Sequence, residues 1–101
     1  MKVFISQPML GRSDEEIRSE RKAIEDKLKN AGHEVIDSMI ADAAPKNDYI
    51  GAWYLGKSIQ LLSCADAAYF IDGWETARGC KIEHSVCLSY NIPIMSIEDL
   101  I

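Results

Sequence analysis

The sequence predicts an α/β fold of the doubly wound, three-layer α/β/α type, with a mostly parallel sheet of about four strands that resembles the flavodoxin and Rossmann arrangements. Short apolar runs alternate with helix-length amphipathic segments in the order βαβαβαβ. Strands separated by such segments pair in parallel through right-handed crossovers, with helices on both faces of the sheet. Because 101 residues is the usual size of one domain, we expect a single domain over residues 1–101.

The first strand and the first helix are the most clearly marked elements. The run KVFIS at residues 2–6 is β-branched and aromatic, which is typical of a buried strand. Ser13 stands three residues before Glu16, the spacing of a capping box, so a helix is expected to begin near Asp14 and to end at Gly32. Its apolar residues form a helical stripe: Ile17, Ile24, Leu28 and Ala31.

The remaining elements alternate in the same way. HEVIDSM, at residues 33–39, predicts a second strand, and a surface loop follows to residue 48. The later elements are expected as a helix over 53–64, a strand over 65–71, a loop over 72–79, a helix over 80–90, a strand over 92–97 and a closing turn over 98–101.

Charge and hydropathy argue against two classes of partner. The net charge is −5 at pH 7 and Lys and Arg do not cluster, so we expect no nucleic acid polymer as a partner. No stretch approaches the roughly 18 apolar residues of a membrane span, and the N-terminus does not have the pattern of a signal peptide. The 3 cysteines form no Cys-x-x-Cys pair, which favours reduced thiols and a cytoplasmic location.

In doubly wound folds a ligand binds beyond the carboxyl ends of the strands, where the strand order reverses. Residues 6–13 and 72–79 are expected there. The first segment, SQPMLGRS, leads into a helix N-terminus, whose free N–H groups and positive dipole end suit a phosphate. Ser6, Gly11 and Arg12 are its candidate residues, but the segment matches no phosphate-loop motif, and a plain strand-to-helix turn is the alternative.

The segment 72–79, DGWETARG, holds more groups that suit a ligand. Gly73 and Gly79 allow a close approach to the backbone. Trp74 offers a stacking surface, and Arg78 can bind a carboxylate or a phosphate through two N–H groups. Together these residues favour a binding site.

Glu83 is the candidate catalytic residue. It lies one turn into the next predicted helix, where the helix dipole favours the ionised form of a carboxylate. An ionised carboxylate that faces a pocket is a potential nucleophile. The alternative is a carboxylate that only stabilises the first turn of its own helix.

A metal site is not expected. Cys80, His84 and Cys87 share one helical face, but the two sulfurs are separated by about 10 Å along the helix axis at 1.5 Å per residue. One zinc ion, with bonds of about 2.0 to 2.3 Å, cannot reach both cysteines. We therefore predict neither a metal nor another cofactor.

Four segments resemble the nucleoside 2-deoxyribosyltransferase-like family and together span nearly the whole chain: VFISQPMLG, GHEVID, SCADAAYFIDGWETARGCKIEH and YNIPI. The most specific block runs from Gly73-Trp74-Glu75 through Ala77-Arg78-Gly79-Cys80 to Glu83. This block is similar to the Gly-Trp-Glu, Ser-Arg-Gly-Ala and Glu signature of the short, often phage-borne members of that family.

The resemblance implies cleavage of the N-glycosidic bond of a deoxynucleoside or its 5′-monophosphate, with Glu83 attacking the anomeric carbon of the sugar. Water as acceptor makes a hydrolase, and a second base makes a transferase. The resemblance places the phosphate near Arg78 and Gly79 and the base against Trp74. The substrate-binding residues expected on this basis are Ser6, Gln7, Pro8, Met9, Gly11, Arg12, Ser58, Asp72, Gly73, Trp74, Arg78 and Gly79.

Position 58 departs from the family pattern. Characterised members carry an aspartate there, eight residues before the equivalent of Asp66, which helps to position or protonate the substrate; this chain has Ser58. A hydroxyl cannot replace a carboxyl as a general acid, a role worth roughly 10²–10⁴ in rate. The alternative function is therefore a module that captures a nucleotide, or a signal derived from one, without turning it over.

The resemblance also implies a homodimer, because some relatives complete their site with residues of the partner subunit. A sheet that ends after its fourth strand leaves an edge that a second subunit can cover. A phosphoacceptor role for Asp72 also suits a doubly wound fold, but the sequence lacks the acidic cluster after the first strand that holds magnesium in such domains.

Overall fold

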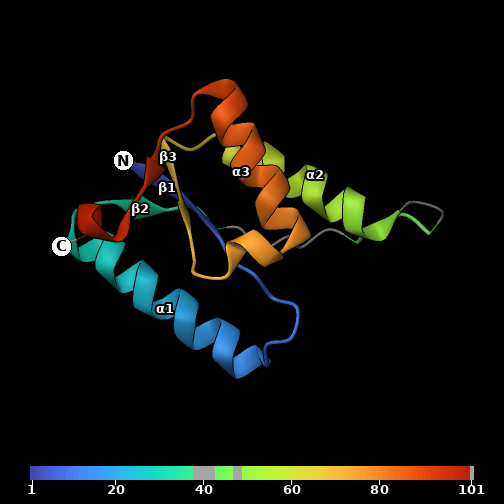
Figure 1. Ribbon diagram of the computed structural model, residues 1–101, viewed down its shortest axis with the longest axis horizontal. Coiled ribbons are helices and arrows are strands. Elements are labelled where there is room, and N and C mark those ends of the chain that lie inside the picture. Colours follow the sequence, from blue (N-terminus) through green and yellow to red (C-terminus); the bar gives the residue numbers. More distant parts are fainter. Residues whose placement is uncertain (38–42, 47–48, 101) are drawn as a thin grey trace.

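The computed structural model describes residues 1–37, 43–46 and 49–100, and these residues form a four-stranded, all-parallel sheet with helices on both sides (Figure 1). The order of the strands in the sheet is β2-β1-β3-β4. Along the chain the elements are β1 (Lys2–Ser6), α1 (Asp14–Asn30), β2 (Glu34–Val35), α2 (Ile50–Leu62), β3 (Ala67–Phe70), the 3-10 helix η1 (Trp74–Thr76), α3 (Arg78–Tyr90), β4 (Ile94–Met95) and the 3-10 helix η2 (Ile97–Leu100).

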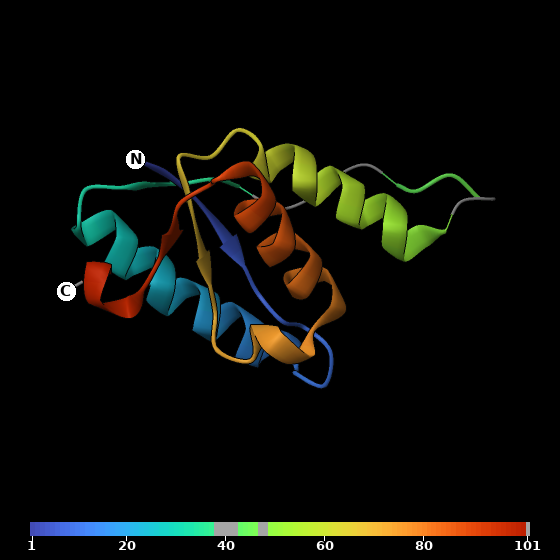
Figure 2. The same cartoon turned by 45° about the horizontal axis from the view of Figure 1, so that its top comes forward.

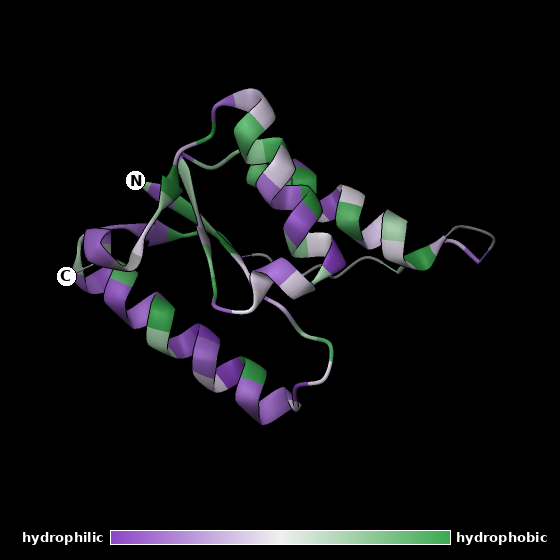
Figure 3. Ribbon diagram, in the orientation of Figure 1, coloured by the Kyte–Doolittle hydropathy of each residue, from purple (hydrophilic) through white to green (hydrophobic). Residues whose placement is uncertain are grey.

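The helices cover both faces of the sheet, which confirms the doubly wound prediction. Helix α1 lies on one side, and α2 and α3 lie on the other, in both views (Figures 1 and 2). Successive strand residues point to opposite faces, so Val3 packs in one core cluster with Leu28 of α1, whereas Phe4 packs in another with Leu62 and Cys87. Hydrophobic residues are concentrated on the strands and along α2, and hydrophilic ones cover much of α1 (Figure 3).

The ends of α1 follow the signals predicted from the sequence. The Ser13 side chain accepts a hydrogen bond from the backbone N–H of Glu16, which satisfies one of the free donors of the first turn. The Glu16 carboxylate accepts a hydrogen bond from the Ser13 hydroxyl at 3.2 Å. Gly32 follows the helix with a φ of +88°, a backbone conformation that glycine adopts without strain.

Several predicted boundaries were wrong. Helix α3 begins at Arg78 rather than at Cys80, because Gly79 has ordinary helical backbone and only Gly73 is left-handed in this segment. The predicted loop over 72–79 therefore contains η1 and the first turn of α3. Helix α2 runs over Ile50–Leu62 rather than 53–64, and among the described residues no helix is both long and apolar enough to cross a membrane.

The strands at the two edges of the sheet are shorter than predicted. Strand β2 pairs with β1 only through Glu34 and Val35, and β4 pairs with β3 only through Ile94 and Met95. The end of the predicted second strand and most of the predicted loop over 39–48 lie outside the described residues.

The strand order reverses between β1 and β3, where one crossover leads from β1 out to β2 and the other from β3 out to β4. Ser6, the last residue of β1, pairs with Phe70, the last residue of β3. The segments that leave these two strands therefore start side by side at the switch point of the sheet, where doubly wound folds bind their ligands.

Candidate functional site

A pocket of about 780 Å³ opens at the carboxyl end of β1, on the side of the sheet that carries α2 and α3. Residues 7–10 form one wall, one side of α2 forms the second, and residues 76–83, from the end of η1 into α3, form the third. Its location agrees with the binding position expected for a doubly wound fold. Glu83 and Arg78, which were expected at one site, both line it.

Glu83 occupies a position of α3 that normally holds an apolar residue. The buried residues of this helix are Cys80, Glu83 and Cys87, which recur at the spacing of one helical face. Glu83 is only 6% exposed, and its Oε1 accepts a hydrogen bond of 2.7 Å from the Ser6 hydroxyl at the end of β1. Strand β1 and helix α3 thus hold one carboxylate oxygen between them.

Burial raises the pKa of Glu83 above its ordinary value, and the hydrogen bond from Ser6 offsets part of that rise. The helix dipole was expected to favour the ionised form of Glu83, but the raised pKa shows that the neutral form is favoured. With α3 beginning at Arg78, Glu83 lies in the second turn, whereas the dipole acts mainly on the first turn. Desolvation therefore outweighs the dipole at this position.

Replacement of Ser6 by Ala removes the hydroxyl that donates to Glu83 and leaves a buried carboxylate oxygen without that donor. We expect unfolding in denaturant to show a loss of about 1–3 kcal/mol. The pKa of Glu83 should also rise further, because the hydrogen bond that lowers it is gone. Ser85→Ala, at an exposed position of α3, the helix that carries Glu83, is the control. Equal stabilities for the two variants would contradict the assigned role of Ser6.

Positive charge gathers around the rest of the pocket. Arg78 and Lys81 line it, and Glu83 is the one acidic residue among the described residues that do so. Helices α2 and α3 both begin at the pocket, and neither has a side-chain cap or an acidic residue in its first turn, unlike α1. Helix N-terminal N–H groups together with two cations favour an anion, in a chain whose net charge is −5.

Helix α2 contributes a wall with apolar and hydroxyl groups. Tyr54 and Ser58 lie four residues apart, on one helical face, and both line the pocket together with Leu55. Ser58 was expected at the site, whereas Tyr54 was not. Its spacing from Ser58 is the sequence signal that could have found it.

Trp74 does not line this pocket, although it was expected to cover the base of a bound nucleoside. Its indole stacks on His84, with ring centroids 4.1 Å apart and an interplanar angle of 12°. His84 in turn meets Phe70 edge-on, at 5.0 Å. Trp74 thus packs η1 against α3 and β3, and Tyr54 is the aromatic side chain that the described part of the pocket offers.

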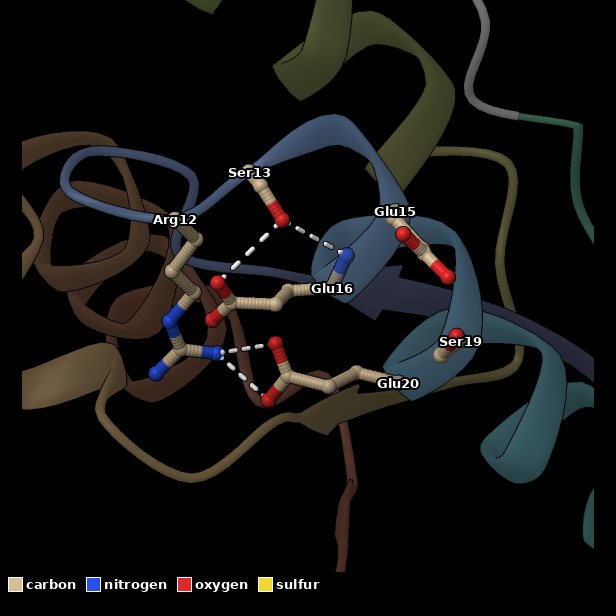
Figure 4. Close-up of a pocket in the computed structure, with 6 residues that line it drawn as sticks. All are labelled: Arg12, Ser13, Glu15, Glu16, Ser19 and Glu20. Atoms are coloured by element: carbon tan, nitrogen blue, oxygen red, sulfur yellow. Dashed lines mark hydrogen bonds and ion pairs between the residues drawn. The ribbon is translucent and has the colours of Figure 1, made fainter.

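Arg12, also expected at the phosphate, binds groups of the protein instead. Its Nη1 donates to both carboxylate oxygens of Glu20 on α1, at 2.7 and 2.6 Å, and its Nη2 donates to the Asp72 backbone carbonyl at 3.0 Å. The Arg12–Glu20 pair lies in a separate, acidic hollow of about 690 Å³ along α1 (Figure 4). Of the residues expected at the site, the following line the pocket beside α2 and α3: Gln7, Pro8, Met9, Ser58, Arg78, Gly79 and Glu83. The others do not line it: Ser6, Gly11, Arg12, Asp72, Gly73 and Trp74.

Two of the three cysteines, Cys80 and Cys87, lie on the buried face of α3. Among the described residues no group of three or more His, Cys, Asp or Glu side chains is arranged to hold a metal ion. Cys80 lines the pocket and is buried, and burial raises the pKa of its thiol. Cys87 lies deeper in the same helix face, where burial raises the pKa of its thiol to about 11. Both thiols therefore stay protonated near neutral pH, which is typical of packing residues.

Comparison with known proteins gives one match. A family model described as "Domain of unknown function (DUF4406)" matches residues 1–96. A search of the curated proteins and a search of the solved structures found no match. The function has therefore to be inferred from the chemistry of the pocket.

Proposed function

Because this chain belongs to the DUF4406 family, which is described as a domain of unknown function, we propose its function from the pocket itself. We propose that it cleaves the N-glycosidic bond of a deoxynucleoside or its 5′-monophosphate, by hydrolysis or by base exchange. The observation that carries the proposal is Glu83, a 6% exposed carboxylate held by Ser6 at 2.7 Å in a pocket that also contains Arg78. The resemblance of residues 73–83 to the nucleoside 2-deoxyribosyltransferase-like signature supports it.

Glu83 is the nucleophile in this proposal. Ser6 holds Oε1, and among the described residues no side chain donates a hydrogen bond to Oε2, which is the oxygen available for attack. As Oε2 bonds to the anomeric carbon, the bond from that carbon to the base breaks. Its electron pair leaves with the base nitrogen, which takes up a proton. Water or a second base then displaces the carboxylate from the anomeric carbon.

Burial supports this role, because it removes water from the carboxylate and leaves a more basic oxygen once the group is ionised. The same effect sets a pH limit. Glu83 must be ionised to attack, and its pKa is raised, so activity should be lost as the pH falls through that raised pKa, earlier than for an ordinary glutamate.

The phosphate of a monophosphate substrate is proposed to bind at the start of α3. Arg78 can form two parallel hydrogen bonds to phosphate oxygens, and Lys81 lies one turn further along the helix. Gly79 has no side chain to cover the backbone next to them. The N-terminal N–H groups of α3 have no side-chain cap, and they and the positive end of the helix dipole both favour an anion there. Base contact is assigned to Tyr54, whose ring can stack on any of the bases.

A capture module is the second candidate, and Ser58 is the observation that favours it. Ser58 lines the pocket at the position where the resembled family has its aspartate, and no second carboxylate stands among the described lining residues. A site without a general acid can bind a nucleotide with the same charges and still release the base slowly. Binding without turnover is the outcome that this candidate predicts.

We also propose a homodimer in which a second copy covers the mouth of the pocket. Met9 and Leu10 line the pocket and are 59% and 97% exposed, and Tyr49 and Ile50, directly before the lining residue Gly51, are 88% and 59% exposed. Exposed apolar groups that gather at one place favour a protein contact. Light scattering coupled to gel filtration tests this proposal, and a monomer at micromolar concentration contradicts it.

The experiment that tests the function is incubation with a panel of deoxynucleosides and deoxynucleoside 5′-monophosphates, followed by chromatography of the free base. Base release that disappears in Glu83→Ala supports the enzyme. Calorimetric binding of a monophosphate with no base release over hours supports the capture module. Neither binding nor release across the panel contradicts both.

A further inference from the structure

Arg12 connects two neighbouring segments of the chain with a third segment that lies 60 residues away. Its Nη1 binds Glu20 on α1, and its Nη2 binds the Asp72 carbonyl in the segment that leaves β3. Its own backbone N–H donates to the Met9 carbonyl at 3.2 Å, which closes the turn that carries one wall of the pocket. Figure 4 shows the guanidinium extended toward Glu20 of α1. One residue therefore contacts the turn after β1, helix α1 and the segment before η1.

The chain leaves room for this guanidinium at Gly73. A Cβ atom at that position would stand 2.5 Å from Arg12 Nη2, and the φ of +95° is one that side chains with a Cβ rarely adopt. The left-handed backbone therefore favours glycine at position 73, and a side chain there would displace the Arg12 guanidinium from its present place. Directly after Gly73 comes η1, whose last residue, Thr76, forms another wall of the pocket together with Ala77 and Arg78.

We propose that Arg12 is a positioning residue that fixes the separation between the wall at residues 7–10 and the wall at residues 76–78. It does not line the pocket to which the phosphate is assigned, and its guanidinium binds Glu20 and the Asp72 carbonyl. Loss of Arg12 removes the hydrogen bond that joins the Asp72 carbonyl to the turn after β1 and so loosens the segment 72–77. The effect on substrate rests on the proposed function, whereas the effect on the segment itself does not.

The helix α1 provides a matched control. Arg21 and Glu25 form an ion pair at 2.8 Å with side-chain exposures of 22% and 27%, close to the 23% and 36% of Arg12 and Glu20. That pair lies within one helix, and among the described residues no hydrogen bond or ion pair joins it to a segment of the pocket. Arg21→Ala therefore removes a comparable ion pair without freeing the walls.

Trp74 reports directly on the segment, because it is the first residue of η1 and follows Gly73. The chain has 2 tryptophans, so a Trp53→Phe background leaves Trp74 as the only one. In that background we expect quenching of the tryptophan emission by acrylamide to rise roughly twofold or more in Arg12→Ala. Arg21→Ala should leave it unchanged.

Arg12→Lys provides a second test, because it keeps a charge near Glu20 but cannot serve Glu20 and the Asp72 carbonyl together. It should raise the quenching to an intermediate value, measured at a temperature where thermal unfolding shows the variant folded. Quenching in Arg12→Ala and Arg12→Lys equal to that in Arg21→Ala overturns the proposal.

Calorimetry with the four common deoxynucleoside 5′-monophosphates then separates this proposal from the proposed function. Weaker binding in Arg12→Ala than in Arg21→Ala supports both. Increased quenching in a protein that binds no nucleotide, even as wild type, supports the positioning role and removes the nucleotide function.

Discussion

Replacement of Glu83 by Gln should lower base release from deoxynucleoside 5′-monophosphates by at least on the order of 10³-fold. The amide keeps nearly the size of the carboxylate and can still accept the hydrogen bond from Ser6, but it cannot form the ester with the anomeric carbon. Calorimetry should show that the nucleotide still binds. Glu75→Gln, at an exposed position of η1, is the control and should retain the wild-type rate.

The same variant should change stability in a way that a surface glutamate does not. The pKa of Glu83 is higher in the folded protein than in the unfolded chain, because folding desolvates it. Its contribution to stability is therefore fully present below the unfolded pKa and is lost as the pH rises through the folded pKa. Relative to wild type, Glu83→Gln should gain stability as the pH is raised through this window, as followed by urea unfolding. A constant difference between the two proteins across the window would contradict the assigned burial.

Replacement of Ser58 by Asp should raise base release by roughly 10²-fold. Ser58 lines the pocket on the same face of α2 as Tyr54, so a carboxyl at this position faces the proposed base. Protonated, it can donate its proton to the leaving nitrogen, a step for which the described lining residues offer no carboxyl other than the nucleophile. Chromatography of the free base measures the gain.

Two controls separate proton donation from simpler effects of this substitution. Ser58→Asn has nearly the same shape as the aspartate but does not titrate, and it should stay at the wild-type rate. Gln60→Asp adds the same charge to α2 at an exposed position that does not line the pocket. If Ser58→Asn also raised base release, the shape of the side chain would be responsible; if Gln60→Asp raised it, the added charge would be. Either result would contradict proton donation by the aspartate.

Local signals were enough to predict much of the fold. The strand at Lys2–Ser6 and the cap of α1 at Ser13 depend on neighbours in the sequence, and both are where the sequence places them. The edge strands β2 and β4 could not be delimited in this way, because their lengths depend on how many residues find a partner on β1 and β3. The start of α3 was missed because Gly79 is compatible with both loop and helix.

The candidate site was predictable where its residues share one element. Arg78 and Glu83 lie in the first two turns of α3, so both are close to the N-terminal end of the helix, where the pocket opens. The partners of Arg12 and Trp74 lie on other elements, and their spacing carries no such information. Glu20 and the Asp72 carbonyl occupy the guanidinium of Arg12, and His84 occupies the face of Trp74. Both side chains have the chemistry of ligand-binding groups, yet they bind the protein itself.

The ester between Glu83 and the sugar is the species that tests the central claim most directly. Deoxynucleoside 5′-monophosphates with a 2′-fluorine in the arabino configuration should slow its hydrolysis, because the fluorine withdraws electrons from the anomeric carbon. After acid quenching and digestion, mass spectrometry should find the fluorinated sugar phosphate on the peptide that contains Glu83, and not in the Glu83→Gln protein. Base release without any such adduct, or an adduct on another residue, would contradict the proposed nucleophile.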